Sequence, residues 1–198
     1  MKPALNPPNS YCNYCGTKFG DILHYPRECA TCGAMVWANP IPVAVALVPV
    51  VNSAPFGGAA SAGEAGLATG LLVVRRGIPP GIGKLALVGG FIEDHESWQV
   101  GCAREVREET GVIVDPASCR LHWVSSSEPR PNRILIFAIT APVDVLPPFV
   151  PNAETQERGV ILGPGGLDEE FAFSTHLEAA KRYFADRGIT GHHAFAPR

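Results

Sequence analysis

The stretch GFIEDHESWQVGCAREVREETGV, from Gly90 to Val112, is the part of the sequence that decides the fold. Ser97 has the side chain of a helix N-cap, and Gly111 suits the left-handed position after a helix. The stretch therefore predicts a helix that begins at Trp98 and ends just before Gly111. One apolar stripe of this helix would be formed by Val100, Ala103 and Val106.

The other side of the predicted helix is unusually acidic. Glu105, Glu108 and Glu109 stand at i, i+3 and i+4, so their carboxylates meet on one face and repel one another. Gly101 adds a cost of about 1 kcal/mol relative to alanine within the helix. A solvated acidic face is the ordinary explanation of such a cluster, but a helix selected for stability alone would avoid both features.

The spacing of the segment favours a functional explanation. It fits the pattern Gly-x5-Glu-x7-Arg-Glu-(aliphatic)-x-Glu-Glu-x-Gly-(aliphatic), a coincidence with a probability on the order of one in a billion per starting position. The matching residues are Gly90, Glu96, Arg104, Glu105, Val106, Glu108, Glu109, Gly111 and Val112. This pattern is the Nudix box, and the chain resembles a Nudix hydrolase.

The residue types of the box indicate the metal that it would bind. Hard carboxylate oxygens suit Mg2+ or Mn2+ rather than zinc. Mg2+ retains waters and shares its coordination sphere with substrate phosphates, so carboxylates beside a diphosphate are the expected arrangement.

The resemblance to Nudix enzymes assigns roles to individual residues. It implies that Glu105 and Glu109 are the main metal ligands, with Glu108 in or near the metal's coordination sphere. The backbone carbonyl of Gly89 is a further candidate ligand. Arg104 is expected to orient a carboxylate, because Arg104 and Glu108 are i, i+4 neighbours. For Glu96, holding the loop and completing the metal cluster both remain open.

Composition excludes several classes of protein. The chain has 198 residues, 46% of them hydrophobic and 18% charged, enough for one ordinary domain and a small appendage. The net charge of −3 and the absence of a basic run do not predict a nucleic-acid partner. The N-terminal sequence has no apolar run, and no stretch is long enough to span a membrane, so we expect a cytoplasmic protein with no membrane partner.

The first four cysteines form two C-x2-C pairs. Cys12, Cys15, Cys29 and Cys32 have a spacing close to that of zinc ribbons, and four thiolates satisfy a closed structural Zn2+ site. Disulfides and a redox C-x-x-C motif are the alternatives. We expect a zinc ribbon over residues 8–38 and a Nudix domain over residues 39–190. The two remaining cysteines, Cys102 and Cys119, are interpreted as core or incidental residues.

Several apolar runs predict the strands of the second domain. These runs are Val43–Val51, Leu71–Arg76, Arg120–Ser125, Arg133–Thr140 and Val160–Leu162. A Gly/Ala/Ser-rich stretch at about 52–70 has no periodicity and predicts a long mobile loop. The fold expected from the resemblance is the α/β/α Nudix sandwich with a mixed sheet. A second helix is predicted from Ser174 to Arg187, before Gly188.

Three further positions are candidates for the site. In SSSEPRPN, residues 125–132, the resemblance to zinc-ribbon Nudix enzymes that cleave NADH is partial, and a proline-rich turn is the alternative. If this loop contacts substrate, Arg130 would pair with a phosphate or Arg133 would stack on a base. Glu154 is a candidate for an extra metal-binding or base carboxylate, with a plain surface residue as the alternative. His176 is interpreted as a helix-face residue rather than a catalytic one.

The resemblance implies a Mg2+-dependent pyrophosphohydrolase that cleaves the diphosphate of a nucleoside diphosphate linked to another moiety, such as FAD, NADH or ADP-ribose. A non-catalytic Nudix-fold regulator and an RNA-cap (NAD-cap) hydrolase are the alternatives, and a mutagenic-nucleotide hydrolase would not need the ribbon. A small-molecule nucleotide is the expected substrate, and a homodimer is expected from the family. The sequence does not identify the preferred nucleotide, the catalytic base or the role of loop 52–70.

Overall fold

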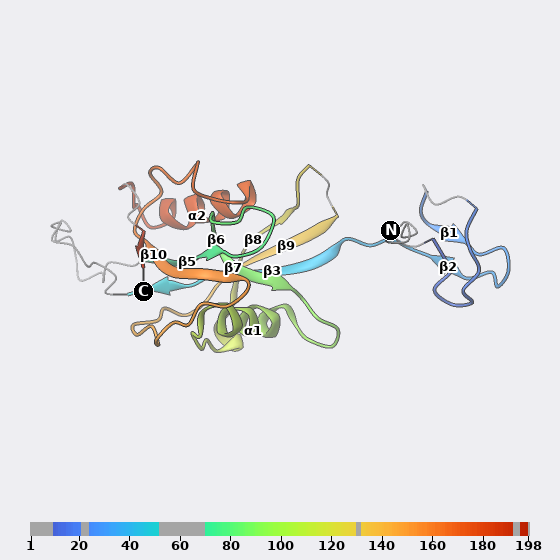
Figure 1. The fold of residues 1–198 in the computed structure, drawn as a ribbon, viewed down its shortest axis with the longest axis horizontal. Helices are drawn as coiled ribbons and strands as arrows, with labels where there is room; N and C mark the ends of the chain where they lie inside the picture. The colour runs from blue at the N-terminus through green and yellow to red at the C-terminus, as the bar shows by residue number, and fades with distance from the viewer. Residues whose placement is uncertain (1–9, 21–23, 52–69, 130–131, 192–194, 198) are drawn as a thin grey trace. The chain divides into compact units, whose positions relative to one another are not determined.

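The computed structural model describes residues 10–20, 24–51, 70–129, 132–191 and 195–197 (Figure 1). The chain divides into two compact units, Met1–Pro40 and Ile41–Arg198. Apart from Gly70, the loop expected at 52–70 lies outside the described residues, as does Arg130. None of the helices in the described ranges has the length and apolar character that crossing a membrane requires.

The first unit is built around a small antiparallel ladder. Strands β1 (Arg27–Glu28) and β2 (Met35–Val36) pair with Arg27 opposite Val36. Its buried apolar cluster contains few side chains, namely Cys12, Cys29 and Val36, with Phe19 and Tyr25 partly buried against them. Among the described residues of this unit, a core of this size is small for an independent fold, which favours stabilisation by a staple such as a metal ion.

The second unit contains a four-stranded mixed sheet. Its strand order is β7 (Val88–Phe91), β3 (Ile41–Leu47), β9 (Arg133–Ile139) and β8 (Arg120–Ser126). Strands β3 and β9 run parallel, whereas the β7–β3 and β8–β9 pairs are antiparallel. The mixed sheet predicted from the sequence is therefore confirmed.

An antiparallel sheet lies beside the mixed one. Its order is β11 (Ala196–Pro197), β10 (Thr155–Ile161), β5 (Gly70–Arg76) and β4 (Pro49–Val50), and β6 (Leu85–Ala86) also pairs with β5. This arrangement brings the end of β5 close to the segment that precedes β10, because Arg76 is opposite Thr155.

Helices cover the two faces of the sheets (Figure 1). Helix α1 (Trp98–Thr110) lies on one side and helix α2 (Ser174–Ala185) on the other, and a short 3-10 turn, η1 (Pro116–Ser118), follows α1. Alternate residues of β3 point to opposite faces. Val43, Val45 and Leu47 belong to the core that includes α2, whereas Ala44 and Ala46 belong to the core that includes α1. The predicted α/β/α sandwich is confirmed.

The observed strands differ most from the sequence prediction in two places. The apolar run Val43–Val51 forms two strands, because the chain passes from one sheet to the other at Val48, whose carbonyl accepts a hydrogen bond from Leu72. Strand β10 begins at Thr155, five residues before the predicted start. The polar residues of its first half concealed this start. Arg158 can nevertheless be buried in the strand, with 2% of its surface exposed, because it donates to two backbone carbonyls.

Candidate active site

The capping of α1 sets the position of the acidic residues. The Ser97 hydroxyl accepts a hydrogen bond from the Val100 backbone N–H at 3.3 Å. Gly111 has a φ of +73° and its N–H donates to the Arg107 carbonyl at 2.8 Å. The predicted helix start and both predicted caps are confirmed, so the spacing of the glutamates along the helix is also fixed.

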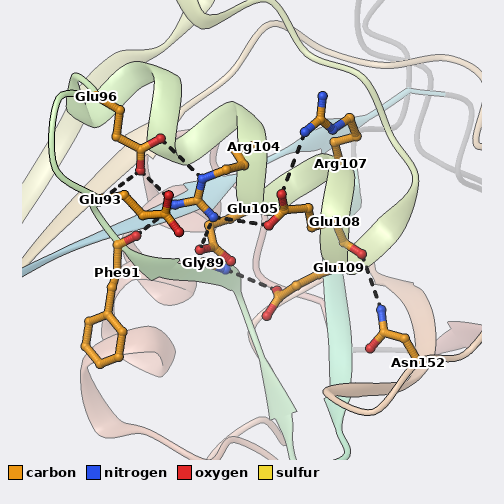
Figure 2. A network of polar contacts seen from close by, with 10 residues as sticks. All are labelled: Gly89, Phe91, Glu93, Glu96, Arg104, Glu105, Arg107, Glu108, Glu109 and Asn152. Carbon is orange, nitrogen blue, oxygen red and sulfur yellow. Dashed lines mark hydrogen bonds and ion pairs between the residues drawn. The ribbon is translucent and has the colours of Figure 1, made fainter.

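Arg104 is the centre of the polar network on α1 (Figure 2). Its Nη1 donates to Glu105 at 2.8 Å and to Glu108 at 3.1 Å, and its Nη2 donates to Glu96 at 2.7 Å and to the Phe91 carbonyl at 2.9 Å. One guanidinium thus offsets the repulsion among three carboxylates and ties the helix to the end of β7. The contact with Glu108 matches the i, i+4 spacing of the two residues, and a role for Arg104 in orienting carboxylates stays a prediction.

Glu96 holds the loop between β7 and α1. Its Oε1 accepts from the Glu93 N–H at 2.8 Å, and both of its oxygens accept from Arg104. The position of this carboxylate also explains Gly101, which is unfavourable for helix propensity. A Cβ at Gly101 would lie 2.8 Å from Glu96 Oε1.

Glu105 and Glu109 lie where α1 meets β7. Glu109 Oε2 accepts a hydrogen bond from the Gly89 N–H at 3.2 Å, as Figure 2 shows. A Cβ at Gly90 would lie 2.4 Å from Glu105 Oε1, so the carboxylate rests directly on the backbone of the strand. Burial, together with the charge of Glu105, raises the pKa of Glu109 to about 8. Burial also raises the pKa of Glu105, against the effect of Arg104.

The other two candidate carboxylates have different surroundings. Glu108 is half-exposed and pairs with Arg104 and Arg107. Glu154 is exposed, and its charge contributes to the raised pKa of both Glu105 and Glu109. Sequence reasoning missed Asn152, which positions Glu154. Its Oδ1 accepts from the Glu154 N–H at 2.9 Å and its Nδ2 donates to the Glu108 carbonyl at 3.3 Å.

A cavity of about 730 Å3 opens beside these carboxylates. Glu105, Glu109 and Glu154 line it together with Gly89 and Gly90. Its volume is in the range of small-molecule sites. Glu96 and Glu108 are not among its lining residues.

Two arginine–aromatic pairs line the same cavity. The Arg133 guanidinium lies 5.7 Å from the ring centre of Phe91, and that of Arg76 lies 4.9 Å from the ring centre of Phe173. Arg133 was predicted as a substrate contact, whereas Arg76, Phe91 and Phe173 were not. The only sequence signal for Arg76 is its position at the end of an apolar strand. His176, interpreted from the sequence as a helix-face residue, is buried and also lines the cavity.

Comparison with known proteins identifies the family. The family model described as NUDIX domain matches residues 60–170, which is more than half of the chain. The chain belongs to the Nudix family. Membership confirms that it is a hydrolase of phosphoanhydride bonds, and it agrees with the carboxylate-lined cavity next to the Nudix box.

Solved structures of Nudix proteins share its fold. The Nudix hydrolase from Nitrosomonas europaea is 25% identical over 93% of this chain and 96% of its own, with a TM-score of 0.66. The bifunctional NMN adenylyltransferase/ADP ribose pyrophosphatase from Francisella tularensis is 19% identical over 76% of this chain and 42% of its own, with a TM-score of 0.55. The NUDIX domain of Shewanella oneidensis NrtR, complexed with ADP ribose, is 16% identical over 75% of this chain and 88% of its own, with a TM-score of 0.54.

The Nudix box glycine Gly90 provides a test of this geometry. Gly90→Ala is expected to lower kcat/KM by about a hundredfold, because the new Cβ displaces the Glu105 carboxylate and so disturbs the alignment of the site. The free energy of unfolding is expected to change by less than about 1 kcal/mol, because the displaced atoms are the end of a flexible side chain. Steady-state kinetics and urea unfolding measure the two effects.

Gly191→Ala is the matched control, since nothing lies within 4 Å of a Cβ at that position. It should leave kcat/KM unchanged. A Gly90→Ala enzyme with wild-type kcat/KM would contradict the position assigned to Glu105.

The cysteines of the first unit form a candidate zinc site. The Sγ atoms of Cys12, Cys15, Cys29 and Cys32 all lie within 4.8 Å of one another. Two sulfur pairs, Cys12–Cys32 and Cys15–Cys29, are 3.8 and 3.6 Å apart. Four thiolates at about 2.3 Å from a tetrahedral Zn2+ are separated by about 3.8 Å, so the cluster fits the ion.

The two C-x2-C loops of this site have the same backbone conformation. Gly16 and Gly33 have φ values of +74° and +71°, and their N–H groups donate to the carbonyls of Cys12 and Cys29. The glycine after each pair is required because side chains rarely adopt a positive φ. The four-cysteine cluster supports the zinc ribbon predicted from the sequence. Cys102 and Cys119 are buried in the Nudix core, as expected.

Proposed function

We propose that this Nudix protein is a Mg2+-dependent (or Mn2+-dependent) pyrophosphohydrolase that cleaves the diphosphate of a nucleoside diphosphate linked to another moiety, of the FAD, NADH or ADP-ribose type. The observation that carries the proposal is the gathering of Glu105, Glu109 and Glu154 in one cavity with two arginine–aromatic pairs. Through a bound divalent cation, the carboxylates suit the diphosphate that links the two parts of such a substrate. The aromatic rings suit its nucleoside parts.

The carboxylates fit a hard divalent cation. Glu105 and Glu109 each have a raised pKa because burial and the charges of neighbouring carboxylates disfavour their ionised forms. A cation between them would remove this cost, and oxygen ligands match Mg2+ or Mn2+. We assign Glu105, Glu109 and the Gly89 carbonyl as its main ligands. Glu108 and Glu96 are assigned outer positions, because Arg104 already engages both.

Each residue then has a role in hydrolysis. When bound, the metal neutralises phosphate charge and makes water more nucleophilic. Arg104 keeps Glu105 oriented, and the Gly89 N–H keeps Glu109 oriented. The exposed Glu154 is assigned as the group that accepts the proton of the attacking water. The water oxygen bonds to one phosphorus as the bridging P–O bond breaks, and two phosphorylated halves leave.

The arginine–aromatic pairs support a substrate with two parts. Phe91 and Phe173 each offer a ring face to a heteroaromatic group, and Arg133 and Arg76 each bring a positive charge to an otherwise acidic cavity. A nucleoside triphosphate has only one such ring. Two aromatic groups therefore favour a dinucleotide, such as FAD or NADH, over a substrate with a single ring. The homodimer expected from the family remains a prediction.

A substrate panel tests the proposal. Purified protein is incubated with FAD, NADH, ADP-ribose, 8-oxo-dGTP and NAD-capped RNA in the presence of Mg2+ or Mn2+, and products are separated by chromatography. We expect at least one of the first three compounds to yield two monophosphates, and EDTA to abolish the reaction. Binding of these compounds without turnover would indicate a regulator, and cleavage of only 8-oxo-dGTP or only the RNA would also overturn the proposal.

A further inference from the structure

The N-terminus of α2 forms a wall of the active-site cavity that the carboxylate chemistry does not use. Phe173, Ser174, Thr175 and His176 all line the cavity. Phe173 is the N-cap residue and, having no polar side chain, makes no capping hydrogen bond. The first backbone N–H groups of a helix have no partner within the helix, so this wall presents hydrogen-bond donors to the cavity.

His176 adds an acceptor to the same wall. Its side chain is 7% exposed, and its Nδ1 is a buried atom without a hydrogen-bond partner. The imidazole has a hydrogen bond to the Leu87 backbone, and because Nδ1 has no partner we assign this bond to Nε2. The proton is therefore on Nε2, and Nδ1 carries a lone pair. A buried acceptor without a partner is costly, so it indicates a group that binds there.

The charge state of His176 excludes an anion as this group. Burial, reinforced by the positive charge of Arg76, lowers the pKa of His176 to about 3, so the imidazole is neutral at physiological pH. A lone pair repels the oxygens of a phosphate. It accepts a hydrogen bond from an N–H, whereas the backbone N–H groups of the same helix turn donate to a neighbouring acceptor.

We propose that His176 and the first turn of α2 select the heteroaromatic ring of the substrate by binding an edge on which an N–H donor lies beside an acceptor. His176 Nδ1 takes the N–H, a backbone N–H of Ser174 or Thr175 donates to the acceptor, and Phe173 stacks on the ring. The inference rests on the proposed function, since the ring belongs to the diphosphate substrate. Adenine and flavin rings both have such an edge.

The position of Phe173 is consistent with this role. Its ring centre lies 4.9 Å from that of His176, and Phe137 contacts the imidazole from another side, with ring centres 5.7 Å apart. Phe137 is fully buried, whereas Phe173 is only partly buried and lies on the cavity wall. Phe173 is therefore the neighbour of the imidazole that a ring in the cavity would contact.

The test combines variants with substrates that lack the ring donor. ADP-ribose is compared with its N6,N6-dimethyl analogue, and FAD with 3-methyl-FAD. In the wild type, at least one methylated compound should have a kcat/KM about tenfold below that of its parent, the loss expected for one buried hydrogen bond. The pair that shows the effect identifies the ring.

Two variants distinguish the role of the Nδ1 acceptor of His176 from that of its Nε2 donor. His176→Gln keeps a donor near the Nε2 position and removes the acceptor at Nδ1, so it should lower kcat/KM for the parent compound about tenfold and leave the methylated compound unaffected. His176→Asn places an oxygen near the Nδ1 position and should restore discrimination between parent and analogue. If His176 had a merely structural role, the variants would lower kcat/KM equally for the parent and the methylated compound, and that result would overturn the proposal.

The proposal can be tested even if the variants do not fold or if no compound is hydrolysed. The analogues probe the wild-type protein directly, and equal kcat/KM values for both pairs would overturn the proposal while leaving the hydrolase function intact. If no compound is hydrolysed, the proposed function fails, and dissociation constants of the same pairs are measured by calorimetry with Mg2+. A tenfold preference for a parent compound would then still support ring selection, and equal constants would overturn it.

Discussion

Replacing Glu109 with glutamine is expected to lower kcat by about a thousandfold or more and to leave the protein folded with its zinc bound. Glutamine keeps the acceptor for the Gly89 N–H, which lies 3.2 Å from the carboxylate, and it keeps the side-chain volume. It removes the negative charge that we assign to metal binding. Because burial already disfavours that charge, the melting temperature of the metal-free protein should not fall.

Glu178→Gln is the matched control for Glu109→Gln. Glu178 is on α2, where it pairs with Arg182 at 2.7 Å, and it does not line the cavity. The same chemical change there should leave kcat unchanged. Steady-state kinetics, thermal unfolding and zinc analysis are measured on both variants. Wild-type kcat in Glu109→Gln, or an unfolded variant, would count against the role assigned to Glu109.

Removing a zinc ligand is expected to unfold the first unit and to spare the Nudix unit. Zinc binding contributes on the order of 10 kcal/mol or more to small cysteine-rich folds, and the apolar core formed by the described residues of this unit has three buried side chains. Cys29→Ser should therefore bind no zinc and lose amide-exchange protection between Cys12 and Val36. The Nudix unit has its own two cores, so its amides should stay protected.

A cysteine outside the cluster serves as the control for this experiment. Cys119→Ala alters a buried cysteine of the Nudix unit and should retain one zinc per chain. A wild-type protein without zinc, or a Cys29→Ser protein with unchanged zinc content and protection, would contradict the zinc ribbon.

The parts of the fold that depend on neighbouring residues could be predicted from the sequence. The start and end of α1 were predicted at the residue level because Ser97 and Gly111 act within one turn of the helix. The apolar run that predicted β3 is similarly local. The cysteine spacing indicated the zinc site because two short loops of the same conformation bring all four thiols together.

The parts that depend on distant contacts could not be predicted. The first residues of β10 are polar in sequence. They form a strand because they pair with β5 and because Arg158 donates a hydrogen bond to the carbonyl of Thr110, 48 residues away. The role of Asn152 depends on the end of α1, 44 residues away. Arg76, Phe173 and His176 meet only after the sheets have formed, so their shared cavity had no local signal.

The central claim is that Glu105 and Glu109 hold divalent metal at the diphosphate of a two-part nucleotide. A crystal structure of the protein with Mg2+ and the α,β-methylene analogue of ADP-ribose tests it most directly. We predict metal density at both carboxylates, with the methylene-bridged phosphates bound to it in the cavity that Glu154 also lines. Carboxylates without metal, or an analogue bound outside this cavity, would contradict the account.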